Sequence, residues 1–228
     1  SNNMKRVSLF LGIAVAAFVI FSQTGAQAVN RSFEQRFAAD TPAGDSGTYS
    51  FDKAHSFINF KVKHMGLIEV PGYFRDFTGT VNFDAKDITK STVEFTAKAT
   101  SVDTGVAARD NHLRSKDFFE VEKFADITFK STKVEKKGKT LMLTGDFTMK
   151  GVTKTITFPF QIAGWVPANE KAGAKMGIVA ETSINRRDFG VNYGGNMPNG
   201  IPTLSDVVKI NLQIEANGPK PAAAAPKQ

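Results

Sequence analysis

The chain has 228 residues, a formal net charge of +7 and no cysteine. Without cysteine, a disulfide framework and every cysteine-based metal or nucleophile site are excluded. The positive charge comes from lysines spread along the chain without a basic and aromatic surface motif, which excludes nucleic acid as the expected partner and leaves weak contact with an anionic membrane surface open.

Residues 1–28 have the pattern of a secretory signal peptide. Met4 is the expected initiator, after three extra residues, and two basic residues precede an apolar run over 7–21. This run is shorter than the roughly 20 residues that span a bilayer, and the small-x-small sequence that ends at Ala28 fits a cleavage site. We expect export with cleavage after Ala28; retention as a membrane anchor is the alternative.

The remaining chain is predicted to form one domain between two irregular ends. Residues 29–47 read as a flexible linker, in which Phe33 and Phe37 have helical spacing, and residues 217–228 (NGPKPAAAAPKQ) read as a disordered tail. The domain is expected over 48–216.

Apolar and polar residues alternate with a period of two through most of 48–216, which is typical of half-buried strands. We count roughly eight such runs, separated by turn signals at 87–90, 136–139 and 150–151. The segment 104–116 lacks the alternation and is predicted to be a short helix and loop that crosses between strands. The pattern indicates an all-β sandwich or barrel, and we predict a single antiparallel barrel because closure removes exposed edges.

A barrel of about eight strands has room inside for side chains alone or for one slender ligand. The inward positions include small residues such as Gly79, Ala97 and Gly145 beside many of the 20 Phe, and a Phe-rich composition favours a large, dry interior. Such a mixture leaves a channel or interlocks into a solid core. The alternation does not decide between the two.

Four ordered segments resemble the YceI-like family and together extend over nearly the whole domain. They are 49–79 (beginning YSFDKAHSFINF), 102–131 (beginning VDTGVAARDNHLRSKDFFEVEKF), 145–158 (GDFTMKGVTKTITF) and 183–190 (SINRRDFG). One departure is Ala125, where the family usually has proline, and it affects only a local turn.

The resemblance implies a lipocalin-like barrel with an elongated apolar pocket. Characterised members bind long-chain amphiphiles such as polyisoprenoids, polyprenyl quinones or fatty-acid derivatives, and many are periplasmic. We therefore expect a periplasmic lipid-binding or carrier protein that is not an enzyme and holds a bound lipid in place of a cofactor. Members often pair, so a homodimer stays open, and the resemblance does not identify the lipid.

If the barrel is hollow, ten inward side chains are predicted to line it and contact the lipid, although each suits a plain core equally. They are Phe60, Val62, Phe77, Phe95, Phe129, Phe147, Phe158, Ile178, Ile184 and Ile210.

Five polar residues are candidates for contact with the head group of the lipid: His64, Arg109, Asp110, His112 and Arg186. Three of them lie on the crossing segment, which is expected near an opening of the barrel. The alternative is structural, with Asp110 bonded to backbone amides or to an arginine so that it pins the crossing loop. The same alternative applies to Arg186.

The motifs of metal and nucleophilic chemistry are missing from the sequence. The three histidines do not have the spacing of metal ligands, and His55, shortly after Asp52, reads as a hydrogen-bonded turn residue. There is no Gly-x-Ser-x-Gly motif. Two other hypotheses stay open beside the carrier: an enzyme that acts on an isoprenoid-like substrate through the His112 region, and a stress-related structural protein with a solid core.

Overall fold

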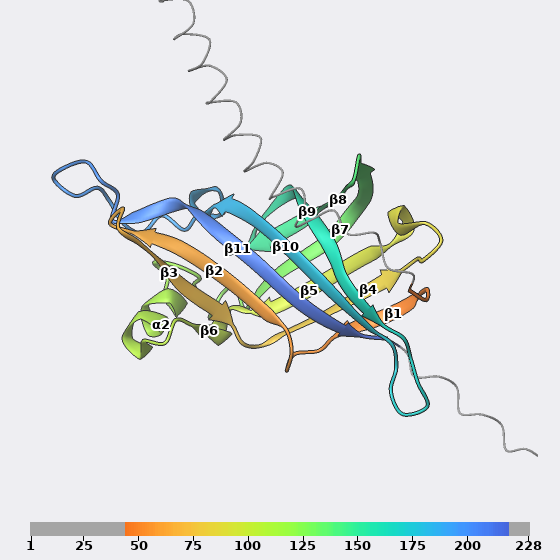
Figure 1. The fold of residues 1–228 in the computed structure, drawn as a ribbon. Helices are drawn as coiled ribbons and strands as arrows, with labels where there is room; N and C mark the ends of the chain where they lie inside the picture. The colour runs from red at the N-terminus through yellow and green to blue at the C-terminus, as the bar shows by residue number, and fades with distance from the viewer. Residues whose placement is uncertain (1–43, 219–228) are drawn as a thin grey trace, which may run out of the picture. The chain divides into compact units, whose positions relative to one another are not determined.

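The computed structural model describes residues 44–218, which form a closed antiparallel β-barrel with one short helix (Figure 1). The predicted signal peptide, Phe33 and Phe37, and residues 219–228 of the predicted tail lie outside the described residues. The tail was predicted to begin at Asn217, but Asn217 is the last residue of the final strand and pairs with Ser50. In chain order the elements are β1 (Gly47–Phe51), β2 (Phe57–His64), β3 (Ile68–Phe74), β4 (Phe77–Phe83), η1 (Ile88–Lys90), β5 (Thr92–Lys98), η2 (Ala99–Ser101), β6 (Val102–Asp103), α2 (Ala107–Arg114), β7 (Asp126–Lys137), β8 (Thr140–Met149), β9 (Val152–Val166), β10 (Lys175–Asn185), η3 (Arg186–Phe189) and β11 (Leu204–Asn217).

Eleven strand segments make an eight-stranded barrel because three of its strands are bent. β1 and β2 follow each other along one edge of β11, β3 and β4 pair with β2 and β1, and β5 and β6 pair with β4 and β3. From β5 the ladder continues through β7, β8, β9 and β10 to β11, and it closes where Ser50 of β1 lies opposite Asn217. The predicted barrel of about eight strands is confirmed.

The alternation did not predict β3, because Pro71 and Gly72 interrupt its middle. Both are ordinary breakers of a strand pattern. In the structure Pro71 lies opposite Lys61, and Gly72 lies opposite Phe60 of β2. Pairing with β2 therefore keeps Pro71 and Gly72 within a continuous strand, although these two residue types are locally typical of a turn.

The crossing segment forms α2, inside the range predicted for it. Arg114 attaches the end of this helix to the wall: its Nε donates to the Thr100 carbonyl at 2.7 Å and its Nη2 to the Val102 carbonyl at 2.9 Å. α2 therefore lies beside β3 and β6 at one end of the barrel (Figure 1). Within the described residues, no helix has the length and apolar character that crossing a bilayer requires.

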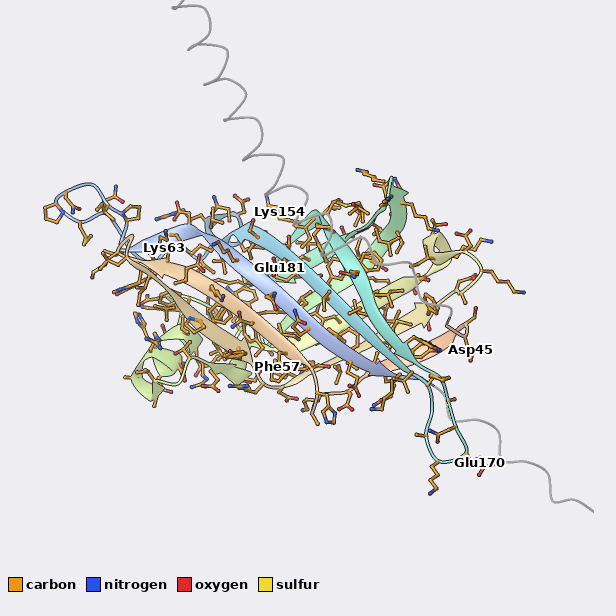
Figure 2. All side chains as sticks on the ribbon, viewed as in Figure 1. Asp45, Phe57, Lys63, Lys154, Glu170 and Glu181 are labelled. Atoms are coloured by element: carbon orange, nitrogen blue, oxygen red, sulfur yellow. The ribbon has the colours of Figure 1, made fainter. Side chains whose placement is uncertain are left out.

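The strands separate an apolar inside from a polar outside. Their buried hydrophobic side chains form one continuous cluster along the inner face. Exposed polar residues such as Lys63, Lys154 and Glu181, labelled in Figure 2, occupy the alternate positions of β2, β9 and β10. The period of two in the sequence thus places the hydrophobic side chains where a lumen can form.

Candidate functional site

The barrel encloses a cavity of about 470 Å³ whose wall is almost entirely apolar. Of the two outcomes that the alternation left open, the structure shows the hollow one. Nine of the ten side chains predicted to line it lie on its wall, while their contact with a lipid stays a prediction: Phe60, Val62, Phe95, Phe129, Phe147, Phe158, Ile178, Ile184 and Ile210.

Glycines in the wall explain why so many phenylalanines leave a hollow. A methyl group added at Gly72 would lie 2.2 Å from the ring of Phe60, and one at Gly145 would lie 2.4 Å from the ring of Phe129. The end of each ring therefore occupies the space beside a glycine of the neighbouring strand. A side chain larger than hydrogen at these positions would displace the rings, so the glycines provide the room that the rings occupy beside the wall.

Phe77 does not line the cavity, so this part of the prediction was wrong. It opens β4 directly after the bend from β3, is 5% exposed and has its ring centroid 6.5 Å from that of Phe95. Phe77 borders a separate pocket of about 150 Å³ beside Lys53 and Arg75. The bend places its ring in a corner of the wall, which the regular alternation does not register.

One end of the cavity is closed by aromatic side chains. The ring of Tyr49 lies 5.4 Å from that of Trp165, and Phe83 packs 6.4 Å from both. Tyr49 is 1% exposed, its hydroxyl donates to the Asp45 carbonyl at 2.8 Å, and burial raises the pKa of its phenol. Of the three, Phe83 lines the cavity, so a chain inside the barrel meets Phe83, with Tyr49 and Trp165 packed against it, at this end. We call this end the floor.

The opposite end is the mouth of the cavity. His64, Arg109 and Tyr193 line the cavity and are also exposed to solvent, whereas the lining residues near the floor are buried. They come from the end of β2, from α2 and from the loop between η3 and β11. Figure 1 shows α2 and this loop at the same end of the barrel.

Besides His64, two more of the predicted head-group residues, Arg109 and His112, line the cavity at the mouth. The ring of His112 packs edge-on against Phe118 and Tyr193, at 5.1 and 4.7 Å, and its Nε2 lies 2.9 Å from Oδ2 of Asp117. The guanidinium of Arg109 donates to the hydroxyl and the carbonyl of Thr104, at 2.7 and 2.8 Å. The imidazole of His112 and the guanidinium of Arg109 are thus both held in place by the protein, at the open end of the cavity.

Asp110 does not line the cavity, and its side chain is engaged within the protein. Its carboxylate is buried and accepts hydrogen bonds from the backbone N–H of Thr104 at 2.9 Å and from the Thr104 hydroxyl at 2.5 Å. The structural alternative holds instead. Asp110 pins the start of the crossing segment, because a buried carboxylate needs such donors.

Arg186 lines the cavity but is engaged by the protein. Its side chain is 4% exposed. It donates to the carbonyls of Val191, Tyr193 and Ser205 at 2.8, 2.7 and 3.0 Å, and to Oδ1 of Asp206 at 3.1 Å. Burial lowers the pKa of the guanidinium, while Asp206 opposes that effect. Arg186 therefore fixes the loop that bounds the mouth.

Near the floor, Asp52, His55 and Glu215 bring their ligand atoms within 4.8 Å of one another. Nδ1 of His55 lies 3.0 Å from Oδ2 of Asp52, which confirms His55 as a hydrogen-bonded turn residue. The ammonium of Lys175 bonds to Glu215 and lies 4.0 Å from Asp52. A protein cation thus already balances these carboxylates.

This cluster predicts a pH dependence of stability. The hydrogen bond from His55 holds the pKa of Asp52 down at about 2, and the bond to Asp52 raises the pKa of His55 above 6.5. The Asp52 contribution is present above its unfolded pKa of about 4 and is lost as pH falls toward 2, whereas the His55 contribution is complete below about 6.5 and is lost above its raised value.

We therefore expect His55→Gln to lower the melting temperature most between about pH 4 and 6.5, and progressively less at higher pH. The effect should be small because solvent screens both groups. Thermal unfolding of both proteins across this range tests it, and a melting-temperature difference that stays constant from acid to alkaline pH would contradict it.

Some residues of the site were missed by sequence reasoning. Leu143 and Leu212 share the inward period and line the wall, so the alternation carried a signal for them. Tyr193, Phe118 and Leu113 reach the cavity from loops and from α2. No strand period extends to these segments, and only the tertiary structure places them at the mouth.

Comparison with known proteins gives consistent matches over this barrel. The model of the YceI-like domain matches residues 49–216. The chain is 41% identical over 169 residues to Protein YceI of Escherichia coli O157:H7, which covers 73% of this chain and 85% of that protein. Protein YceI of Salmonella arizonae is 39% identical over 177 residues, or 77% and 89% of the two chains.

Solved structures share the fold. BcnA of Burkholderia cenocepacia aligns with a TM-score of 0.64 and 26% identity, covering 73% of this chain and 99% of that one. The YCEI protein of Campylobacter jejuni aligns with a TM-score of 0.61 and 32% identity over 69% and 90%. A polyisoprenoid binding domain from Saccharophagus degradans has a TM-score of 0.55 over 77% and 100% of the chains, and at 16% identity it shows the fold alone.

Proposed function

The chain belongs to the YceI-like domain family, and from this premise we propose that it is a periplasmic carrier that encloses one long-chain amphiphile. The ligand class that we propose is a polyisoprenoid, a polyprenyl quinone or a fatty-acid derivative. The observation that carries the proposal is the apolar cavity of about 470 Å³, open at one end and floored by aromatic rings at the other. Its volume is within the usual range of small-molecule sites, roughly 300–1,000 Å³.

The chemistry of the wall favours a hydrocarbon chain. Each methylene moved from water to such a wall contributes about 0.8 kcal/mol, so a long tail provides ample gross driving force, partly offset by the ordering of the chain. Aromatic rings such as Phe60 and Phe129 line the wall and can pack against methyl groups and double bonds. A polyisoprenoid is the first candidate, because the structurally similar Saccharophagus degradans domain is described as binding one.

The mouth supports an orientation with the polar head outward. Arg109, His112 and Tyr193 lie there, whereas the lining side chains near the floor are almost all aromatic or aliphatic, with the hydroxyl of Ser91 as the polar exception. A head group buried at the floor would lose its hydrogen bonds with water. We therefore propose that the tail enters first and that Arg109 and His112 contact the head.

Export to the periplasm is part of the proposal and rests on the signal-peptide pattern of residues 1–28. Sequencing the N-terminus of the protein recovered from the host's periplasm tests it. A mature chain that begins at Val29 is expected. A protein that keeps Met4 and sediments with membranes would overturn this part.

Ligand identification tests the carrier itself. Protein purified from its native host should release one amphiphile per barrel on extraction with organic solvent, identified by mass spectrometry, and the emptied protein should take up an added polyprenyl quinone or fatty acid. Protein that carries no amphiphile and takes up none would sink the proposal. His112→Ala removes one proposed head-group contact but keeps the apolar wall of the strands, so it should weaken uptake of the amphiphile without abolishing it.

A further inference from the structure

The turn between β2 and β3 exposes three apolar side chains at its tip. Met65, Leu67 and Ile68 are 36%, 77% and 64% exposed. Ile201, 38% exposed, comes from the loop between η3 and β11 and packs against this turn: a methyl at Gly66 would lie 3.2 Å from its Cγ2. We call Met65, Leu67, Ile68 and Ile201 the apolar tip.

The apolar tip differs from the rest of the outer surface of the barrel, which is mostly polar. Leu67 and Ile68 have the two highest exposed fractions among the large hydrophobic side chains of residues 44–218. The backbone N–H of Met65 donates to the Thr203 carbonyl at 3.0 Å, so the turn and the loop are joined. A contiguous exposed apolar cluster is typical of a surface that contacts a partner or a membrane.

Three lysines lie on the two neighbouring strands β2 and β11 next to this tip. Lys61 and Lys63 lie on the outer face of β2, and Lys209 of β11 is paired opposite Lys61. We call these three the lysine collar. Glu69 bonds to Lys209 and is the carboxylate among them, so the collar has a net positive charge. Long lysine side chains reach past an apolar surface toward anionic groups.

The tip also borders the mouth of the cavity. His64 directly precedes Met65 and pairs with Leu204, and both residues line the cavity wall. Figure 1 shows the turn between β2 and β3 beside the loop before β11, at the end of the barrel that carries α2. A surface that covers the tip therefore lies next to the opening.

From this arrangement we propose that the apolar tip docks on an anionic phospholipid bilayer. The four apolar side chains enter the boundary between head groups and acyl chains, and the lysine collar contacts the phosphates. The mouth then faces the membrane from which a lipid enters or to which it returns. The purpose of docking rests on the proposed carrier function, whereas the docking itself depends only on the surface.

Vesicle binding tests the inference directly. The purified protein should co-sediment with vesicles of phosphatidylcholine and phosphatidylglycerol, and more weakly with phosphatidylcholine alone or at high salt. The double variant L67D/I68D should bind the anionic vesicles at least about tenfold more weakly. Lys61→Glu with Lys63→Glu should remove most of the preference for anionic vesicles.

Val166→Asp is the matched control, because Val166 is 54% exposed at the end of β9, in the region of the closed floor. It should bind vesicles as the wild type does. Three results would overturn the inference: a wild type that does not bind anionic vesicles, an L67D/I68D variant that binds equally well, or a wild-type dimer that this variant dissociates without any vesicle binding.

Extraction of lipid from the same samples separates this inference from the carrier proposal. Retained lipid without vesicle binding would remove docking and leave the carrier proposal standing. Vesicle binding by a protein that never holds lipid would leave docking standing and remove the carrier.

Discussion

Thr182→Trp is expected to abolish lipid retention while the barrel stays folded. Thr182 lies on the inner face of β10, opposite Ile210, and lines the cavity. An indole at this position occupies the space that a hydrocarbon chain would use. Overpacking a filled core costs about 1–3 kcal/mol, but here the ring enters a hollow, so we expect a smaller loss or a gain of stability.

The neighbouring residue provides the control. Ser183 is exposed on the outer face of the same strand, so Ser183→Trp adds the same ring without entering the lumen and should leave retention intact. Solvent extraction with mass spectrometry measures the lipid, and thermal unfolding verifies the fold. A folded Thr182→Trp protein with its full complement of lipid would show that the ligand binds elsewhere.

Arg186→Met is expected to lower the free energy of unfolding by about 3 kcal/mol or more, since it leaves buried carbonyls and Asp206 without their donor. Methionine keeps the length of the side chain but cannot donate to Val191, Tyr193 or Ser205. The loop from Val191 to Thr203 should loosen with it. Urea unfolding measures the first effect, and faster hydrogen exchange in the loop measures the second.

Arg187→Met separates burial from charge. Arg187 bonds to the same Asp206, at 2.6 Å, but its side chain is 41% exposed. An exposed ion pair contributes about 1 kcal/mol or less, so this variant should change stability little and leave the exchange of the loop slow. Equal losses of unfolding free energy in the two variants would mean that the burial of Arg186 and its hydrogen bonds to the loop carbonyls add nothing to stability beyond the ion pair with Asp206.

Strands and inner faces could be predicted because alternation is a local signal. The period of two assigned Phe129, Phe147 and Phe158 to one side of their strands, and all three line the cavity. The crossing helix was found by the same means, as the one segment where the period fails. The alternation does not predict bends. Phe77 continues the inward register of β4 but lies directly after the bend from β3 and borders a separate pocket.

What the sequence determined by itself is therefore the family, the number of barrel strands and which side chains turn inward, since each of these follows from short-range pattern or ordered motifs. Only the tertiary structure decided that the lumen is hollow, because that depends on rings such as Phe60 and Phe129 finding glycines on neighbouring strands. It also placed the mouth and gave Asp110 and Arg186 their structural roles. The volume of the lumen depends on contacts between strands that are distant in the chain. The hydrogen bonds of Asp110 and Arg186 go mainly to residues outside the strands, so no strand period predicts them.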